Sequence, residues 1–357
     1  MKKVLHILAV MLTSSFAFAQ DETEAATSPA TTWGGSADAY YKYDFSKQMN
    51  GLTSFTNSQD SFELGMASVQ AGHTFGKASV FVDLGFGKRA GEFSYNETTD
   101  KDINAKFLIK QLFFTYQVTD KFKFVAGSFG THIGYEVLDA VGNKNYSMSY
   151  AFSYGPFFNT GLKAQYTSGK FTAMLGVTNP TDFKSAMDAG SSQKTYIAQV
   201  GYIGETGSAY LNFTSGSTNP VSDENKTQID FVASKTITDA FSLGFNATYA
   251  KTNNDIDSAL DGDWFALVGY ANYAFKPSLS LAYRMEYFDA KKAAASLGTL
   301  TGSNVFANTV SLNYKVGKLT IIPELRYDAA SEDIFLDKDA APTGGSFYGL
   351  VATTYSF

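Results

Sequence analysis

The chain has 357 residues, of which 44% are hydrophobic and 15% aromatic, and its formal net charge is -6. The acidic balance argues against nucleic acid or anionic lipid as a partner. The absence of cysteine excludes disulfides, thiolate metal sites and thiolate catalysis, and so aromatic a chain is not expected to be disordered.

The first predicted element is an export signal. Two lysines precede an apolar run that ends in Ala17-Phe18-Ala19, and small residues at these positions are what a signal peptidase reads. We predict a signal peptide over residues 1–19 and a flexible periplasmic arm over residues 20–31. The alternative is an N-terminal membrane anchor, but the apolar run is shorter than the ~20 residues that a spanning helix needs.

From residue 32 onward, apolar-rich segments are separated by connections that alternate between short and long. The short ones have the composition and length of hairpin turns: Gly76-Lys77, 119–121, 168–170, 204–207, 238–240, 276–278 and Gly317-Lys318. The long ones are rich in Gly, Ser, Asn, Asp and Lys: 45–60, 88–104, 131–156, 180–192, 217–225, 252–262, 290–303 and 329–345. Seven turns and eight loops separate sixteen strands, the layout of an outer-membrane barrel.

Within several segments, apolar and polar residues alternate as they do in a strand with one face in lipid and one in water. In LTIIPELRYD (319–328) the odd-numbered residues are apolar or aromatic, and LSLAYRMEYF (279–288) and FSLGFNATY (241–249) repeat the pattern. In SFELGMASVQAGHTF (61–75) the polar set changes phase, which indicates a β-bulge. In AKFLIKQLFFTYQV (105–118) both faces are largely apolar, so its faces are not assigned.

Aromatic residues recur beside the short turns, where rings with a polar edge would lie at the headgroup boundary. The alternative is the ordinary preference of aromatic residues for strands. The residues of this predicted girdle are Phe75, Tyr116, Phe122, Tyr166, Phe171, Tyr202, Tyr210, Phe241, Tyr273, Phe275 and Tyr314.

The chain ends on a strand, VATTYSF (351–357). Unpaired backbone N–H and C=O groups cost several kcal/mol each in hydrocarbon, so the first and last strands must pair. We therefore predict an all-β fold: a transmembrane antiparallel up-and-down β-barrel of about 16 strands over residues 32–357, with short periplasmic turns and long extracellular loops. Tyr355 and Phe357 resemble the C-terminal signal that the barrel-assembly machinery reads in bacterial outer-membrane proteins.

The mature chain resembles the OmpL-like β-barrel porin family of the bacterial outer membrane. The likeness is strongest at ADAYYKYDF (37–45), over residues 134–166 and at YRMEYFDA (283–290). The resemblance implies a pore in the cell outer membrane of a Gram-negative bacterium.

In general porins the third extracellular loop folds inward and narrows the channel, and residues 131–156 are the third long connection. The aromatic side chains of this segment would bury no apolar surface if the loop extended into bulk water. We expect it to fold inward and to place Glu136, Asp139, Lys144 and Asn145 at a pore constriction. The alternative is packing over the barrel mouth or against a neighbouring subunit.

Charged residues also fall on the expected inner faces of the strands. In a water-filled lumen these charges would determine whether the channel prefers cations or anions. In the alternative, they form ion pairs across strands and stabilise the wall. This alternative applies above all to the strands of Arg284 and Glu324. The predicted lumen-wall residues are Asp38, Lys42, Asp44, Asp83, Lys163, Asp230, Arg284, Glu286, Glu324, Arg326 and Asp328.

Barrels of sixteen to eighteen strands leave an aqueous passage, so we expect passive diffusion of small hydrophilic solutes. The alternatives are a non-conducting barrel with a surface-structural or adhesion role and a substrate-selective channel. Expected partners are outer-membrane lipids, the barrel-assembly machinery and the solutes; a homotrimer stays open. The acidic balance favours cations, although net charge does not locate the charges at the constriction.

Catalysis, a metal site and a cofactor are not expected. A triad needs a histidine partner, and His73 and His132 are the histidines of the mature chain. GFGKRAG (85–91) lacks the spacing and the helix of a phosphate loop. NNDIDSALDGD (253–263) lacks the ligand spacing of a calcium loop, so both are assigned to extracellular loops.

Overall fold

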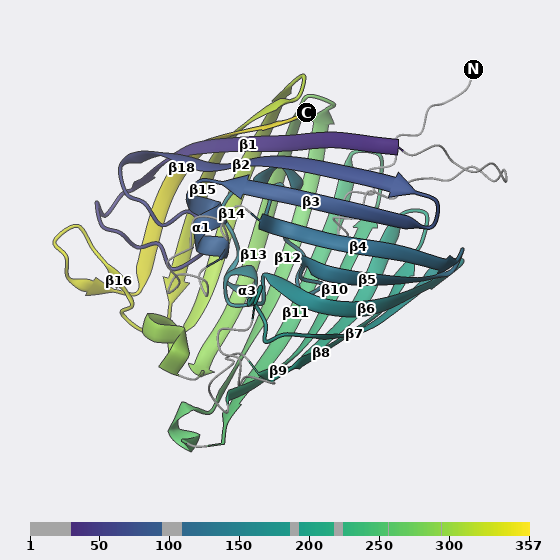
Figure 1. Ribbon diagram of the computed structural model, residues 1–357. Coiled ribbons are helices and arrows are strands. Elements are labelled where there is room, and N and C mark those ends of the chain that lie inside the picture. Colours follow the sequence, from purple (N-terminus) through teal and green to yellow (C-terminus); the bar gives the residue numbers. More distant parts are fainter. Residues whose placement is uncertain (1–29, 95–108, 186–192, 218–223, 256, 294) are drawn as a thin grey trace.

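The computed structural model describes residues 30–94, 109–185, 193–217, 224–255, 257–293 and 295–357. The predicted signal peptide and most of the predicted arm lie outside these residues. Sixteen of the described strands form one closed antiparallel barrel (Figure 1). They are β1 (Ala30–Asp44), β2 (Ser61–Phe75), β3 (Ala78–Phe86), β4 (Ile109–Thr119), β5 (Phe122–Gly130), β6 (Phe158–Ser168), β7 (Phe171–Thr178), β8 (Thr195–Ile203), β9 (Gly207–Ser217), β10 (Glu224–Thr236), β11 (Phe241–Asn254), β12 (Gly262–Lys276), β13 (Leu279–Lys292), β14 (Asn304–Val316), β15 (Leu319–Ala330) and β18 (Gly345–Ser356).

The predicted fold is confirmed, including the pairing of the first and last strands. β18 pairs with β15 on one side and with β1 on the other. Beyond β18, the N–H of Phe357 donates to the carbonyl of Gly35 at 3.1 Å, and the N–H of Gly35 donates back at 3.3 Å. Each barrel strand therefore has a partner along both edges, as a sheet in hydrocarbon requires.

The two faces of the barrel differ as the alternating pattern predicts. On β15, Leu325 and Tyr327 are exposed on the outer face, and Glu324 and Arg326 between them are buried on the inner face. The other strands repeat the outer pattern, for example at Leu211. Exposed apolar side chains on so many strands form the band that acyl chains cover. No helix within the described residues is long and apolar enough to cross a bilayer.

Most residues of the predicted girdle lie on this outer face beside the short turns, as the exposed rings of Tyr116, Phe171 and Phe275 illustrate. Tyr210 is an exception. It is buried on the inner face of β9, because it stands one position out of phase with the outward-facing Leu211.

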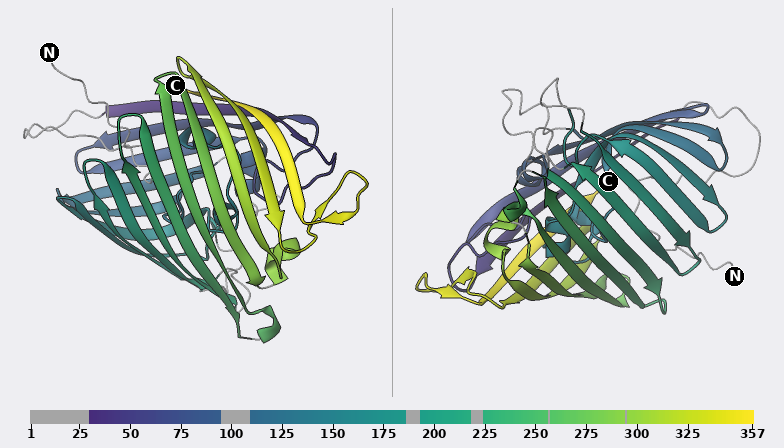
Figure 2. Two further views of the ribbon diagram at one scale, coloured as in Figure 1. Left: turned by 180° about the vertical axis from the view of Figure 1, so that it is seen from behind. Right: turned by 90° about the horizontal axis from the view of Figure 1, so that it is seen from below.

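The connections contain short elements that the sequence does not predict. They are the helices α1 (Lys88–Phe93) and α3 (Tyr150–Ser153), the 3-10 turns η2 (Ala140–Gly142), η3 (Ser258–Leu260) and η4 (Ala295–Leu300), and the hairpin of β16 (Phe335–Leu336) with β17 (Pro342–Thr343). Figure 2 shows the strands tilted around the barrel and this hairpin projecting beyond its rim. The expectation that GFGKRAG lacks a helix is wrong, because α1 begins within it. The segment still lacks the residue spacing of a phosphate loop.

The predicted bulge lies at Gly65 of β2. In the pairing of β1 with β2, Asp38 lies opposite Met66 and Ala39 opposite Leu64, so Gly65 has no partner of its own. The extra residue shifts the alternation by one position, which is why the polar set of this strand changes phase. A second bulge, at Lys110 of β4, lies opposite the step from Asp83 to Leu84.

The Gly65 bulge leads to a first prediction. A Cβ atom at Gly65 would overlap Asp38 Oδ2 and would lie 2.9 Å from the hydroxyl of Tyr146, so Gly65→Ala must displace a buried contact. We expect a loss of about 1–3 kcal/mol in unfolding free energy, measured by urea titration of the barrel in liposomes. Gly269→Ala is the control, because a Cβ atom there meets open space; equal midpoints for the two variants would contradict the prediction.

Candidate functional site

The candidate site is the inner wall of the barrel together with the third loop, which comprises residues 131–157 between β5 and β6. The eleven predicted lumen-wall residues all occupy inward-facing positions of their strands. Nine of them are buried, Asp38 has a side chain that is 4% exposed, and Lys163 is partly exposed. What buries most of them is the third loop.

Carboxylates of the wall accept hydrogen bonds from backbone N–H groups of the third loop. Glu324 on β15 accepts from Tyr146 at 2.7 Å and from Ser147 at 3.1 Å. Glu286 on β13 accepts from Tyr150 at 2.8 Å and from Ala151 at 2.7 Å. Hydrogen bonds to an ionised acceptor are stronger than neutral ones, so these contacts hold the backbone firmly.

A third carboxylate, Asp230 on β10, holds the start of the loop. It accepts from the N–H of Gly134 at 3.0 Å, and the amides of Asn212 and Asn246 also donate to it. The loop is thus attached to three well-separated strands through its main chain.

Two arginines of the wall bind carbonyl oxygens of the same loop. Arg326 donates to the carbonyl of Met148 at 2.7 Å and pairs with Asp328 at 2.7 Å. Arg284 donates to the carbonyl of Ser147 and forms an ion pair with Glu136. Both guanidinium groups are 1% exposed or less, so each buried charge has an opposite charge beside it, as burial demands.

Two tyrosines of the third loop reach back to the wall. The hydroxyl of Tyr146 donates to Asp38 at 2.6 Å, and that of Tyr150 donates to Asp328 at 2.8 Å. Burial raises the pKa of both phenols above the usual range. Both groups therefore stay protonated at neutral pH and remain donors.

Aromatic packing fills the space between the third loop and strands β10 to β15. Tyr135 stacks on Tyr270 with 4.1 Å between ring centroids, and Tyr150 packs with Trp264 and Phe288 in one buried cluster. In Figure 1, α3 of the loop lies within the outline of the barrel. This side of the lumen is occupied by protein.

The four predicted constriction residues lie at different places along this loop. Glu136 contacts Arg284 of β13, and Asp139 contacts Lys110 of β4 and Ser68 of β2. Asn145 donates to Ser311 of β14 at 2.7 Å, and the carbonyl of the neighbouring Lys144 accepts from Asn313 at 2.9 Å. The structure does not bring the four side chains together.

Two buried cations, Lys110 and Arg89, were not predicted from the sequence. Lys110 lies within 3.0 Å of Asp83, 2.7 Å of Asp139 and 2.8 Å of the Ser68 hydroxyl. It was missed because the bulge at this residue breaks the alternation of β4.

The second is Arg89 of α1. Its guanidinium lies 3.7 Å from Asp38 and over the rings of Phe55 and Tyr146, and its Nη1 donates to the carbonyl of Leu138. It comes from a long connection, where strand periodicity cannot indicate which way a side chain points.

The wall formed by β4 to β9 is different. Toward the short-turn end, its inward-facing side chains are partly exposed, among them Gln117, Lys123, Lys163, Gln165 and Gln199. Lys163 lies over the ring of Phe129, 3.9 Å from its centroid. This part of the inner wall therefore presents accessible polar groups.

The two histidines of the described residues do not form a catalytic pair. His132 Nε2 lies 2.9 Å from the carbonyl of Phe213, and His73 Nδ1 lies 2.8 Å from the hydroxyl of Thr31. Burial lowers the pKa of His132 to about 4, so this ring is neutral at pH 7. No group of three His, Asp or Glu side chains suited to a metal occurs among the described residues.

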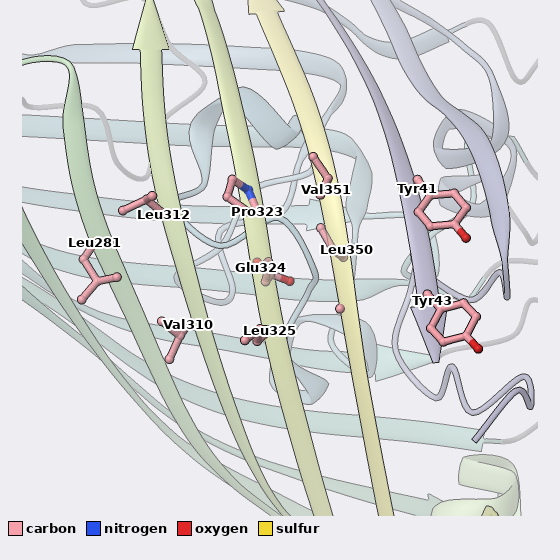
Figure 3. Close-up of a pocket in the computed structure, with 11 residues that line it drawn as sticks. Tyr41, Tyr43, Leu281, Val310, Leu312, Pro323, Glu324, Leu325, Leu350 and Val351 are labelled. Carbon is pink, nitrogen blue, oxygen red and sulfur yellow. The ribbon is translucent and has the colours of Figure 1, made fainter. Parts of the chain in front are cut away.

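An apolar hollow on the outside of the barrel is not part of this site. It lies over β13, β14, β15, β18 and β1 and is lined by outward-facing residues such as Leu281, Leu312, Pro323 and Val351 (Figure 3). A second hollow of the same kind lies beside Phe245 and Met285. Both open onto the apolar band rather than the lumen.

Comparisons with known proteins agree with this architecture. A family model described as "Putative beta-barrel porin-2, OmpL-like" matches residues 30–357. A search of curated protein sequences finds no match.

Solved structures with the same fold include the anion-selective porin from Comamonas acidovorans, with a TM-score of 0.64 and 13% identity over 92% of this chain and 100% of that one. OmpT of Vibrio cholerae has a TM-score of 0.60 and 12% identity over 95% of this chain and 100% of that one. The outer membrane channel DcaP of Acinetobacter baumannii has a TM-score of 0.57 and 12% identity over 92% of this chain and 97% of that one.

Proposed function

The chain belongs to the OmpL-like β-barrel porin family, and on that premise we propose that it is an outer-membrane porin for the passive diffusion of small hydrophilic solutes. The observation that carries the proposal is the closed sixteen-strand barrel with an accessible polar wall on β4 to β9. A barrel of this strand number is wide enough for an aqueous passage.

In this proposal the third loop sets the width of the passage. Its backbone is bound to wall carboxylates on β10, β13 and β15, so it narrows the lumen from one side. Glu136, Asp139 and Asn145 serve mainly as anchors, since each contacts the wall.

The wall charges then act largely as braces. Arg284, Arg326 and Asp328 are committed to ion pairs and loop contacts, which favours the bracing alternative for these residues over free ion sites. No enzymatic role is proposed.

The remaining parts of the proposal concern export and assembly. Residues 1–19 act as a signal peptide and the residues after them as a periplasmic arm. Tyr355 and Phe357 act as the signal for the barrel-assembly machinery, which the ordered pairing of Phe357 with Gly35 supports. One relative of the same fold was solved as a trimer, OmpT of Vibrio cholerae, and we propose a homotrimer here.

A second candidate is a barrel sealed by its third loop. The aromatic cluster around Tyr150 and Phe288 favours it, because it fills one side of the lumen. Liposome swelling separates the two. We expect proteoliposomes to swell in isotonic sugars, with rates that fall steeply as sugar size increases. No swelling with any sugar, from protein shown on gels to be folded, would support the sealed barrel.

A further inference from the structure

The part of the inner wall formed by β4 to β9 contains no acidic residue. Over the described ranges of β4 to β9 the sequence has no Asp or Glu, and its charged residues are Lys110, Lys123 and Lys163. The acidic residues of the barrel strands all lie on the other ten strands. The net charge of the whole chain, -6, therefore does not determine the electrostatic potential along this wall.

The acidic groups on the opposite side are already engaged. Glu286 and Glu324 accept two backbone N–H groups each, and Asp328 is paired with Arg326. All three are buried under the third loop. Their burial keeps these three carboxylates from direct contact with a solute in the aqueous space.

Two of the three lysines on β4 to β9 remain uncompensated. Lys110 is neutralised by Asp83 and Asp139. Lys123 and Lys163 lie on the inner faces of the paired strands β5 and β6, where Val125 is opposite Lys163 and Lys123 is two residues away. Within the described part of the chain, no carboxylate lies at salt-bridge distance from either ammonium group.

The third loop supplies another cation from across the barrel. The carbonyl of Lys144 is bonded to Asn313 of β14, and β14 and β6 are eight strand steps apart in either direction around the closed sheet. The Lys144 side chain is partly exposed and has no acidic partner among the described residues. Cationic groups thus face the passage from opposite walls.

We propose that the passage prefers small anionic solutes over cations, with Lys123 and Lys163 on the wall and Lys144 on the third loop as the residues that set this preference. The inference rests on the proposed pore function and names its solute class. It reverses the cation preference that the net charge favours. A ring of one charge sign in a narrow aqueous pore raises the local concentration of the opposite ion.

The first test is the zero-current potential of the full-length mature barrel in a planar bilayer under a tenfold KCl gradient. We expect a sign that corresponds to greater permeability for chloride than for potassium. Neutralising Lys163 (Lys163→Gln) should lower the ratio of chloride to potassium permeability roughly fourfold, because a unit charge across ~10 Å of water changes the local concentration of each ion about twofold, in opposite directions. The triple variant Lys123→Gln, Lys144→Gln, Lys163→Gln should lower this ratio further, and 1 M salt should weaken the preference of the parent chain.

Lys170→Gln removes a lysine from the exposed turn after β6 and should leave the ratio unchanged. A pore that prefers potassium, or a ratio that the triple variant does not alter, overturns the inference and leaves the pore function standing.

A second test does not depend on conduction. The chain has no cysteine, so a single cysteine at Gln165, two residues from Lys163 on the same face, can be modified with anionic or cationic methanethiosulfonate reagents. The measured quantity is the ratio of the anionic to the cationic reaction rate. We expect this ratio to be higher for the cysteine at position 165 than for a cysteine in place of the exposed Thr238. Lys163→Gln should reduce the difference between the two positions. If the barrel does not conduct but the ratio is higher at position 165, the proposed pore function is refuted and the cationic character of the wall at Lys163 is supported. If the ratio is the same at both positions, the cationic character of the wall is refuted.

Discussion

Deleting residues 345–357 is expected to abolish the folded barrel. These residues include β18, which pairs with β1 and β15, so the deletion leaves two strands with unpaired edges. Each unpaired N–H or C=O group in hydrocarbon costs several kcal/mol, and a dozen of them exceed the stability of any such domain. On unheated SDS gels, where folded barrels migrate differently from unfolded chains, the truncated chain should run only as the unfolded species.

A deletion of similar kind in the last loop provides the control. Residues 334–341 belong to the β16–β17 hairpin region, which projects beyond the rim (Figure 2), and their removal leaves the pairing of β15 with β18 intact. This variant should keep the folded band. A folded band from the 345–357 deletion would contradict the claim that closure is required.

The double variant Glu286→Gln with Glu324→Gln is expected to release the third loop and to raise unitary conductance several-fold. Each carboxylate accepts two backbone N–H groups with its two oxygens. A glutamine keeps one acceptor and turns a donor toward the other N–H group. An unsatisfied buried donor costs about 1–3 kcal/mol, and two such losses should shift the loop toward detached states.

The barrel itself should survive this change, because its strand pairing does not involve either side chain. Glu332→Gln, at an exposed position of the last long connection, is the matched control and should conduct like the parent chain. Unchanged conductance of the double variant, with a folded band on gels, would show that these carboxylates do not hold the loop.

Strand number, turn positions and the face of most strands were predictable from the sequence because lipid imposes a strict period. Outward positions such as Leu325 and Val351 must be apolar, and the seven short turns must be compact. β-Bulges are exceptions to this alternation of inward and outward residues. The local sequence pattern can indicate that a bulge is present but does not identify the extra residue. The phase change around Gly65 was visible, whereas at Lys110 both faces are apolar enough to hide it.

The arrangement of the third loop was much less predictable. Its contacts join Tyr146 to Glu324 and Tyr150 to Glu286, more than a hundred residues apart in sequence, and no local rule relates such positions. Arg89 shows the same limit, because a side chain from a long connection can enter the lumen without any periodic signal. The composition of β4 to β9, by contrast, was readable once the structure showed which wall remained accessible.

Planar-bilayer recording of the purified, folded, full-length mature chain tests most directly the claim that this barrel encloses a water-filled passage beside an anchored third loop. We predict discrete unitary conductance steps in KCl that are larger for the Glu286→Gln, Glu324→Gln variant than for the parent. Electrical silence from both proteins, with the folded band present on gels, would contradict that claim.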